Sequence, residues 1–397
     1  MDLLAINCGS STLKAALIDA ASGARRLSAL FDRVGQPVAT LAIDDGTPDN
    51  VTLADTASAL ERLAELLVAR SLAPDAVVHR IVHGGVQHTR PILLDAAVVA
   101  DIEALSALAP LHHPPAVAGL RAAHRLWPGL PQVAVFDTAF HATLPRHARE
   151  YALPRALVER HGLRRYGFHG TSHAFVARQA AGFLGRPLDE LRLVTCHLGN
   201  GCSVAAIECG RSVDTSMGMT PLEGLPMGTR SGDLDPGMLL ALMRAEGLSV
   251  EETEELLSRG SGFLGLAGSS DLREIEARAA AGDDAAQLAI QVFSHRLRKY
   301  IGAYAAVMGG IDAIVFTGGI GEHSVLVRHR VLARLDFLGA PLNEDLNRDA
   351  RVDRGHPVAT IAEPQARVQL LVVATDEELA MVEEAAVLLG WRAGLEA

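Results

Sequence analysis

Residues 3–18 read LLAINCGSSTLKAALI. The apolar runs at 3–6 and 13–18 predict two buried strands, and the Gly- and hydroxyl-rich residues 7–12 between them predict a turn. The pattern returns in LRLVTCHLGNGCSVAAI, residues 191–207, with strands at 191–196 and 203–207 around a turn at 197–202. Each hairpin is too apolar to stand alone. We therefore expect an internal duplication in which each hairpin borders a larger sheet.

Two further apolar runs end in polar residues. Residues 133–136 lead into Asp137, and residues 313–316 lead into the sequence TGGIG at 317–321. We interpret these runs as a second matching pair of strands, with ligand-binding loops at their ends. Helical spacing at 56–70 and an Ala-rich stretch at 284–308 predict helices. With 397 residues, the chain is expected to form two related α/β domains.

Composition narrows the class of protein. The net charge is −11, which argues against a nucleic acid or an anionic membrane as partner. The N-terminus has no basic segment typical of a signal peptide, and no long charge-free apolar stretch predicts a membrane helix. The four cysteines lack the C-x-x-C spacing of metal sites, which fits a reduced compartment. We expect a cytoplasmic protein.

Three Gly-rich segments are candidates for binding phosphates. They are residues 7–12, followed by Lys14, residues 197–202 and residues 317–321. Glycine lets backbone N–H groups approach an anion without a Cβ in the way. Each segment alone could be a tight turn that needs glycine. Their joint occurrence in a duplicated fold favours phosphate binding, although none has the Rossmann or Walker A spacing.

Two carboxylates are placed to hold Mg²⁺, which prefers one or two carboxylates together with phosphates and water. Asp137 follows a predicted strand, and Glu377 follows the strand expected at 370–373. Glu377 could equally be a first-turn acid that stabilises a helix through its dipole. Its position alone does not separate these two readings.

The candidate cations are Arg80 and Arg230. Arg80 interrupts an apolar run and therefore needs a partner, and Arg230 lies in the Gly-rich sequence PMGTRSGD at 226–233. The planar guanidinium suits carboxylate and phosphate oxygens. A structural salt bridge is the more common role of such an arginine.

Histidines add hydrogen-bond donors. His169 and His173 are four residues apart, as in zinc helices, but Gly170 and Thr171 interrupt the pattern and no glutamate follows His169. We therefore favour a histidine that donates to a developing phosphoryl charge. A buried structural role remains open for His173.

These residues together resemble the acetate kinase (acetokinase) family, within the superfamily that includes actin and the sugar kinases. The most specific motifs are RYGFHGTSH at 165–173 and GTRSGD at 228–233. The matching stretches are 7–14, 79–85, 110–115, 136–141, 165–173, 197–201, 214–237, 270–273, 316–322 and 375–379.

The resemblance implies an α/β fold of two duplicated actin-like ATPase (ribonuclease H-like) domains that face each other across a cleft. The first domain would contain residues 1–145 and 376–397, with the C-terminal helix returning to it. The second, nucleotide-binding domain would contain residues 146–375. The resemblance also implies a homodimer.

The implied reaction is the reversible transfer of the γ-phosphoryl group from ATP to acetate, with Mg²⁺ or Mn²⁺, by direct in-line attack. Asp137, His169, Arg230 and Arg80 would be catalytic. Arg80, Val82, Leu111 and Pro221 would bind acetate, and Asn7 and Glu377 would bind the metal. The nucleotide would be bound by Lys14, His197, Leu198, Gly199, Asn200, Gly201, Asp271, Leu272, Arg273, Gly319, Ile320, Gly321 and His323.

Three alternatives are a propionate or butyrate kinase, a sugar kinase and a catalytically inactive nucleotide-binding relative. Nothing resembles a general base poised for a sugar hydroxyl, and the intact set of catalytic residues argues against an inactive relative. Five positions depart from the commonest family pattern: Cys8, Thr12, His113, His323 and Asp376. Cys8, next to the first Gly-rich segment, is expected to make activity sensitive to oxidation.

Overall fold

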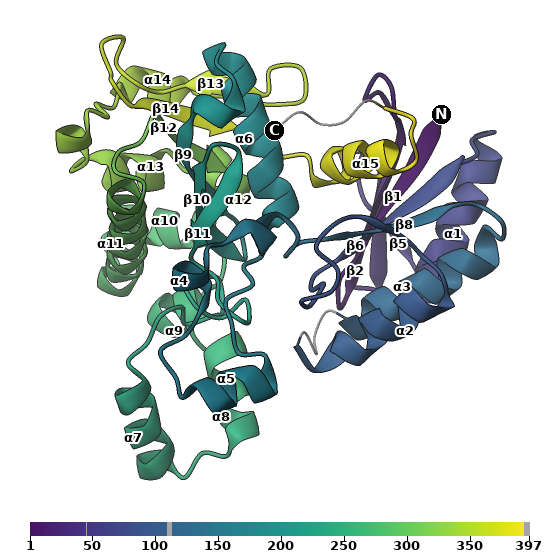
Figure 1. Cartoon of the computed structure of the whole chain (residues 1–397), viewed down its shortest axis with the longest axis horizontal. Helices are drawn as coiled ribbons and strands as arrows, with labels where there is room; N and C mark the ends of the chain where they lie inside the picture. Colours follow the sequence, from purple (N-terminus) through teal and green to yellow (C-terminus); the bar gives the residue numbers. More distant parts are fainter. Residues whose placement is uncertain (45, 109–112, 393–397) are drawn as a thin grey trace. The chain divides into compact units, whose positions relative to one another are not determined.

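The structure is a computed structural model that describes residues 1–44, 46–108 and 113–392. The chain divides into two compact units. Unit 1 contains Met1–Ala142 and the described residues from Asp376 to Arg392, and unit 2 contains Thr143–Thr375. Each is an α/β unit built on one sheet (Figure 1), so the predicted fold class is confirmed. Among the described residues, no helix has the length and apolar character needed to cross a membrane.

The sheet of unit 1 has the strand order β5-β4-β3-β2-β1-β6-β8-β7. Strands β1, β6 and β8 are parallel, and β2 pairs antiparallel with β1 so that Lys14 lies opposite Asn7. The strands are β1 (Asp2–Cys8), β2 (Thr12–Asp19), β3 (Arg25–Asp32), β4 (Ala39–Ile43), β5 (Asp49–Val51), β6 (Ala76–Ile81), β7 (Ile92–Leu93) and β8 (Gln132–Phe136). The parallel strands bring the carboxyl ends of β1, β6 and β8 to one edge.

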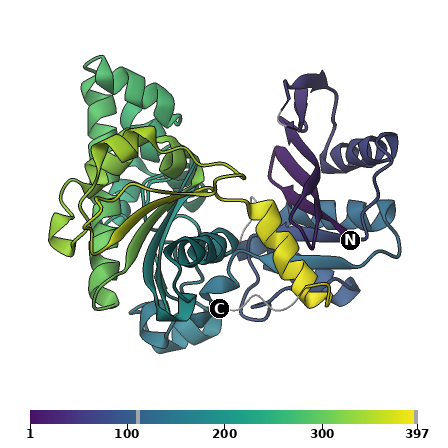
Figure 2. The same cartoon turned by 90° about the horizontal axis from the view of Figure 1, so that it is seen from above.

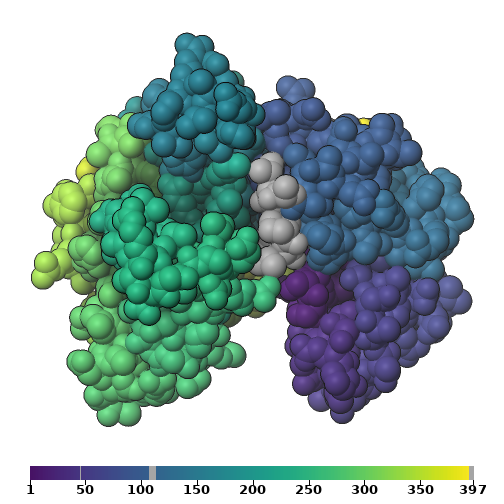
Figure 3. Space-filling model, turned by 90° about the horizontal axis from the view of Figure 1, so that it is seen from below, coloured from purple at the N-terminus to yellow at the C-terminus, as the bar shows by residue number. Residues whose placement is uncertain are grey.

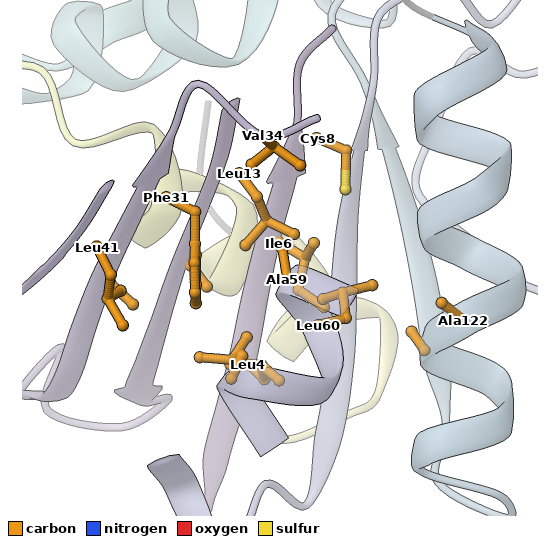
Figure 4. Packing of buried hydrophobic residues seen from close by; sticks show 14 of the residues in the cluster. Leu4, Ile6, Cys8, Leu13, Phe31, Val34, Leu41, Ala59, Leu60 and Ala122 are labelled. Atoms are coloured by element: carbon orange, nitrogen blue, oxygen red, sulfur yellow. The ribbon is translucent and has the colours of Figure 1, made fainter. Parts of the chain in front are cut away.

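Both faces of the sheet are buried around β1. Leu4 and Ile6 of β1 pack with residues of α1 (Thr56–Ala69) and α3 (His113–Leu126), as Figure 4 shows. Leu3 and Ala5 point to the other face and pack against α15 (Glu377–Leu388), drawn in yellow in Figure 2. Alternation along the strand therefore divides its residues between two cores. The remaining helix of unit 1, α2 (Ala96–Ala104), packs against α3.

The sheet of unit 2 has the order β11-β10-β9-β12-β14-β13, and β9, β12 and β14 are parallel. Its strands are β9 (Arg192–Leu198), β10 (Cys202–Glu208), β11 (Arg211–Thr215), β12 (Ala313–Thr317), β13 (Val358–Thr360) and β14 (Gln369–Val373). Helix α6 (Gly170–Leu184) packs on β9, β12 and β14, and α11 (Asp284–Val307) packs on β9 and β10. Figure 1 shows these two helices on opposite sides of the sheet.

The other helices of unit 2 surround this sheet or extend from it (Figure 1). They are α4 (Arg146–Arg149), α5 (Arg155–His161), α7 (Pro236–Glu246), α8 (Val250–Arg259), α9 (Gly262–Ala267), α10 (Leu272–Ala280), α12 (Gly318–His323), α13 (Val325–Leu332) and α14 (Glu344–Asp349).

The two sheets repeat one arrangement. In unit 1, β3, β2 and β1 form an antiparallel run followed by the parallel strands β6 and β8. In unit 2, β11, β10 and β9 are followed in the same way by β12 and β14. The predicted match between the two hairpins is confirmed. The predicted match between residues 133–136 and 313–316 is wrong, because β12 lies directly beside β9 as β6 lies beside β1.

Candidate active site

Unit 1 gathers four predicted site residues at the carboxyl edge of its parallel strands. Asn7 lies near the end of β1, Arg80 near the end of β6, and Asp137 directly after β8, where its N–H donates to the carbonyl of Ile81. Glu377 is the first residue of α15. We call these four residues the Arg80 cluster. Parallel pairing explains their proximity, because it aligns the ends of strands that are far apart in sequence.

Arg80 holds two of these carboxylates. Its Nε and Nη2 donate to the two carboxylate oxygens of Asp137 at 2.8 and 2.7 Å, and its Nη1 lies 3.5 Å from Glu377 Oε2. Burial alone lowers the pKa of Arg80, but the charges of Asp137 and Glu377 outweigh it and raise the pKa above its usual value. The expected partner of this arginine is therefore present. This pairing is also what a structural salt bridge requires, so the geometry alone does not assign a catalytic role.

The Arg80 cluster fits a divalent cation. Two carboxylates share one guanidinium, and the side chain of Asp137 is only 2% exposed whereas that of Glu377 is 19% exposed. Glu377 is also the first residue of α15, which is the position expected for an acid that stabilises the helix through its dipole. Among the described residues, no group of three His, Cys, Asp or Glu side chains forms a protein-only metal site. Mg²⁺ usually needs fewer protein ligands than that, because water and substrate phosphates complete its shell.

Unit 2 contains a histidine cluster formed by His169, His173, His197 and Ser203. Ser203 Oγ lies 2.9 Å from His169 Nδ1 and 2.8 Å from His173 Nε2, and His173 Nδ1 lies 2.7 Å from Thr195 Oγ1. The rings of His169 and His197 stack with centroids 4.3 Å apart. His173 is fully buried between two hydroxyls, which is the structural role left open for it.

His169 precedes the first turn of α6 with a φ of 57°, in the left-handed region that a residue with a Cβ rarely adopts. Such a conformation costs about 1–2 kcal/mol and persists only where the surrounding structure imposes it. A Cβ at Gly201 would lie 3.4 Å from His169 Nε2 and 3.5 Å from Arg230 Nη1. His169, Gly201 and Arg230 therefore meet at one place in unit 2.

Arg230 differs from Arg80 in its surroundings. Its Nη1 donates to the Pro221 carbonyl at 3.3 Å and contacts Met227 Sδ at 3.6 Å. Within the described part of the chain, no carboxylate lies within 4 Å of its guanidinium. Burial lowers the pKa of Arg230. A partly buried cation with neutral neighbours is stabilised by any anion that reaches it.

The Gly-rich segments take two different forms. Residues 199–201 form a tight turn, and the Gly228 N–H donates to the Asn200 carbonyl at 3.2 Å. The segment expected as a loop at 317–321 is instead the start of helix α12. Gly318 allows this with a φ of 75°, where a Cβ would lie 2.7 Å from the Leu198 carbonyl oxygen. The Gly318 N–H donates to Glu322 Oε1 at 2.9 Å, whereas the N–H groups that follow it in the first turn lack backbone acceptors within the helix.

The remaining predicted residues are distributed over both units. Asp271 accepts from the Arg273 N–H and caps α10, which also begins with the buried Leu272. Lys14 is exposed on β2, His323 is exposed at the end of α12, and Val82 is half-buried after β6. The predicted acetate contact Leu111 lies outside the described residues.

Several polar residues of unit 2 were not anticipated. Ser172 Oγ lies 2.8 Å from His197 Nδ1 and 3.0 Å from Thr375 Oγ1. Glu322 Oε1 accepts from the N–H groups of Gly318 at 2.9 Å and Thr375 at 3.1 Å. Glu322 thus ties the start of α12 to the last residue of unit 2. The signal in the sequence was only a glutamate directly after a Gly-rich segment.

The surroundings of Cys8 argue against the expected redox role. Cys8 is buried against α3, where a Cβ at Gly119 would lie 2.6 Å from its sulfur. Burial raises the pKa of the Cys8 thiol to about 12, so it stays protonated at neutral pH. Because the thiolate is the reactive form, we expect this cysteine to be unreactive.

Comparisons with known proteins agree with these features. Residues 2–383 match the model of the acetokinase family. The acetate kinase of Carboxydothermus hydrogenoformans is 46% identical over 395 residues, which cover 97% of this chain and 98% of that protein. The crystal structure of Porphyromonas gingivalis acetate kinase superposes with a TM-score of 0.91 at 40% identity, covering 98% of this chain and 99% of that one.

A propionate kinase from Francisella tularensis is also similar, with a TM-score of 0.90 and 38% identity over 96% of this chain and 98% of that one. Identity at this level extends along nearly the whole length of each chain. This chain belongs to the acetokinase family.

Proposed function

We propose that this protein is an acetate kinase that reversibly transfers the γ-phosphoryl group of ATP to acetate, giving acetyl phosphate and ADP. Together with the family, one observation on this chain supports the proposal. The Arg230 guanidinium is partly buried beside His169 and Gly201, and no described carboxylate neutralises it. A transferring phosphoryl group and a carboxylate are both anions that a planar guanidinium binds with two oxygens.

The reaction needs charge stabilisation more than covalent chemistry from the protein. An acetate oxygen attacks the γ-phosphorus while the bond to the ADP oxygen breaks, and no proton has to be removed from a carboxylate. If Ser203 donates its proton to His169 Nδ1, the proton of His169 is on Nε2, the nitrogen nearest Gly201 and Arg230. His169 and Arg230 then both offer N–H donors to the equatorial oxygens of the phosphoryl group.

We propose separate roles for the members of the Arg80 cluster in unit 1. Asn7 and Glu377 would hold Mg²⁺, and Asp137 would orient Arg80 through its two hydrogen bonds. When bound, Mg²⁺ neutralises part of the charge on the nucleotide phosphates. We propose that Arg80 binds the acetate carboxylate through Nη1, which also lies 3.5 Å from Glu377 Oε2.

The first test is formation of acetyl phosphate from acetate and MgATP, trapped as the hydroxamate. A chain that binds ADP without forming acetyl phosphate would be the inactive relative. A second test uses ATP made chiral at the γ-phosphorus. Direct transfer gives inversion, and retention would reveal a phospho-enzyme and contradict the mechanism.

We expect Val82, Leu111 and Pro221 to determine the choice of acid; of these, Leu111 lies outside the described residues. The similarity to a propionate kinase makes propionate the second candidate substrate. One methylene changes discrimination by only about 10–200-fold in an apolar pocket. Measuring kcat/KM for acids of two, three and four carbons decides between them.

We also propose that two copies of the chain associate through α7. No residue of this helix is buried in the single chain, and Leu234, Met238 and Leu240 expose apolar surface along it and just before it. Figure 3 views the protein from this end of unit 2. Light scattering should show a dimer for the wild type and a monomer for the double variant Met238→Ser/Leu240→Ser.

A further inference from the structure

Helix α13 carries an arginine that the proposed reaction does not use. Arg328 is 0% exposed and is the largest fully buried side chain in the described chain. It lies on the apolar face of α13 together with Val327, Val331 and Leu332. Burying a guanidinium is expensive unless every donor has a partner. The arginine therefore needs an explanation.

All the hydrogen bonds of Arg328 go to neutral acceptors. Its Nη1 donates to the carbonyls of Gly321 and Glu322, both at 2.9 Å. Its Nε donates to Asn347 Oδ1 at 2.8 Å, and its Nη2 donates to the Asn347 carbonyl at 2.9 Å. No carboxylate of the described residues lies within 4 Å. Burial, followed by the nearby charge of Arg351, lowers the pKa of Arg328 to about 10, so it remains a cation at neutral pH.

These contacts fix the end of α12. The carbonyls of Gly321 and Glu322 belong to the last turn of this six-residue helix and have no partner within it. Arg328 provides that partner from the buried side. At the other end of the helix, Glu322 Oε1 accepts from the Gly318 N–H. The helix is thus held at both ends, although it contains three glycines and is too short to be stable alone.

We propose that Arg328 is a positioning residue for the nucleotide phosphates, because it holds the Gly319–Gly321 backbone in the geometry that binds them. This inference rests on the proposed function, in which that backbone cradles ATP. The planar, rigid guanidinium of Arg328 donates to two separate segments, the end of α12 and Asn347. A lysine at this position has one nitrogen and cannot serve both.

The test compares Arg328→Met, Arg328→Lys and Asn347→Ala with a matched control, Arg298→Met. Arg298 also donates to carbonyls at a helix end, those of Val331 at 3.1 Å and of Arg330, but it does not touch α12. The measurements are the Kd of MgADP by calorimetry, KM for acetate, and Tm. A purely structural role would lower Tm in the Arg298 and Arg328 variants alike.

We expect the Kd of MgADP to rise about tenfold or more in Arg328→Met and Arg328→Lys, and less in Asn347→Ala. KM for acetate should change by less than about twofold, and Arg298→Met should bind MgADP as the wild type does. Unchanged affinity in the folded Arg328 variants, or an equal loss in Arg298→Met, overturns the inference. If Arg328→Met does not fold, Arg328→Lys and Asn347→Ala decide. Failure of the wild type to bind MgADP would instead overturn the proposed function.

Discussion

Three arginines show how one residue type takes different roles according to its partners. Arg80 is paired with the carboxylates of Asp137 and Glu377, and their charges raise its pKa despite burial. Arg328 binds only neutral acceptors in the interior. Arg230 has neutral neighbours as well, but it faces Gly201 and His169. Of the three, Arg230 is the one most suited to gain an anion during catalysis.

Replacing Arg230 with alanine should therefore reduce kcat more than it affects KM for acetate. Loss of one preorganised donor to a transition-state oxygen costs about 10²–10³ in kcat. The control is Arg259→Ala on α8, whose exposed guanidinium forms an ion pair with Glu255 in the same helix. Steady-state kinetics with both substrates provides the comparison. A change confined to KM would show that Arg230 binds the ground state and transition state equally.

Burial also predicts the reactivity of the cysteines. Cys8, Cys196 and Cys202 are buried and Cys209 is exposed. Burial raises the pKa of Cys8 and of Cys202 to about 12, and that of Cys196 further. The three buried thiols therefore form very little thiolate below pH 9. A thiol reagent such as DTNB should label one cysteine per native chain at pH 8, the exposed Cys209, and four after denaturation.

The variant Cys209→Ser should abolish the labelling of the native protein, and Cys8→Ser should leave it unchanged. Inactivation by peroxide should likewise be the same in the wild type and in Cys8→Ser. Rapid labelling of Cys8 in the native protein would contradict the burial of this thiol.

At the scale of elements, α12 depends on one backbone conformation. Gly318 has a φ of 75°, and a Cβ there would lie 2.7 Å from the Leu198 carbonyl oxygen, whereas a Cβ at Gly319 would meet nothing within 4 Å. Gly318→Ala should therefore lower the free energy of unfolding by at least about 1–2 kcal/mol. Gly319→Ala, in the same helix, is the stability control and should be nearly neutral. Urea denaturation that gives equal midpoints for the two variants would contradict this account.

The elements also show what the sequence could predict. Both hairpins were found because short apolar runs around a Gly-rich turn are a local signal. The correspondence of β12 with β6 was not predicted. Parallel strands that are buried on both faces all appear in a sequence as similar apolar runs, so one sequence does not reveal their order in the sheet. The residues of helix α12 were expected to form a loop because glycine has a low helix propensity. The contacts that stabilise this helix come from the side chains of Glu322 and Arg328.

The candidate site was predictable to a similar extent. Asn7, Arg80 and Asp137 lie together because the ends of β1, β6 and β8 share one edge of the sheet. The sequence indicated polar residues at strand ends, but it did not indicate that these three strands are neighbours. The contacts of Ser203 and Ser172 with the histidines were not predictable, because a serine in an apolar strand or helix has many possible partners. Helical spacing in the sequence places Arg328 on the apolar face of α13 with Val331 and Leu332, so its burial was predictable.

At the scale of the whole molecule, unit 1 is discontinuous in sequence. Its sheet is complete by β8, yet one face is covered by α15, which the chain reaches only after passing through all of unit 2. Met381, Val382, Ala385 and Ala386 of α15 complete the core around Leu3 and Ile18. Glu377, at the start of the same helix, belongs to the Arg80 cluster. One element thus supplies both packing and a carboxylate of the proposed metal site.

A chain that ends at Thr375 should therefore have a selectively destabilised unit 1. Burial of Met381 and Val382 alone contributes roughly 3–6 kcal/mol, a large part of the 5–15 kcal/mol typical of a whole domain. Hydrogen exchange read by mass spectrometry should show loss of protection in β1, β2 and β6, while β9, β12 and β14 stay protected because their partners all precede Asp376. The full-length variant Glu377→Gln separates the two roles of the helix: it should keep protection in both units and lose activity. Equal loss of protection in both sheets of the truncated chain, or none in β1, would show that α15 does not stabilise unit 1 in particular.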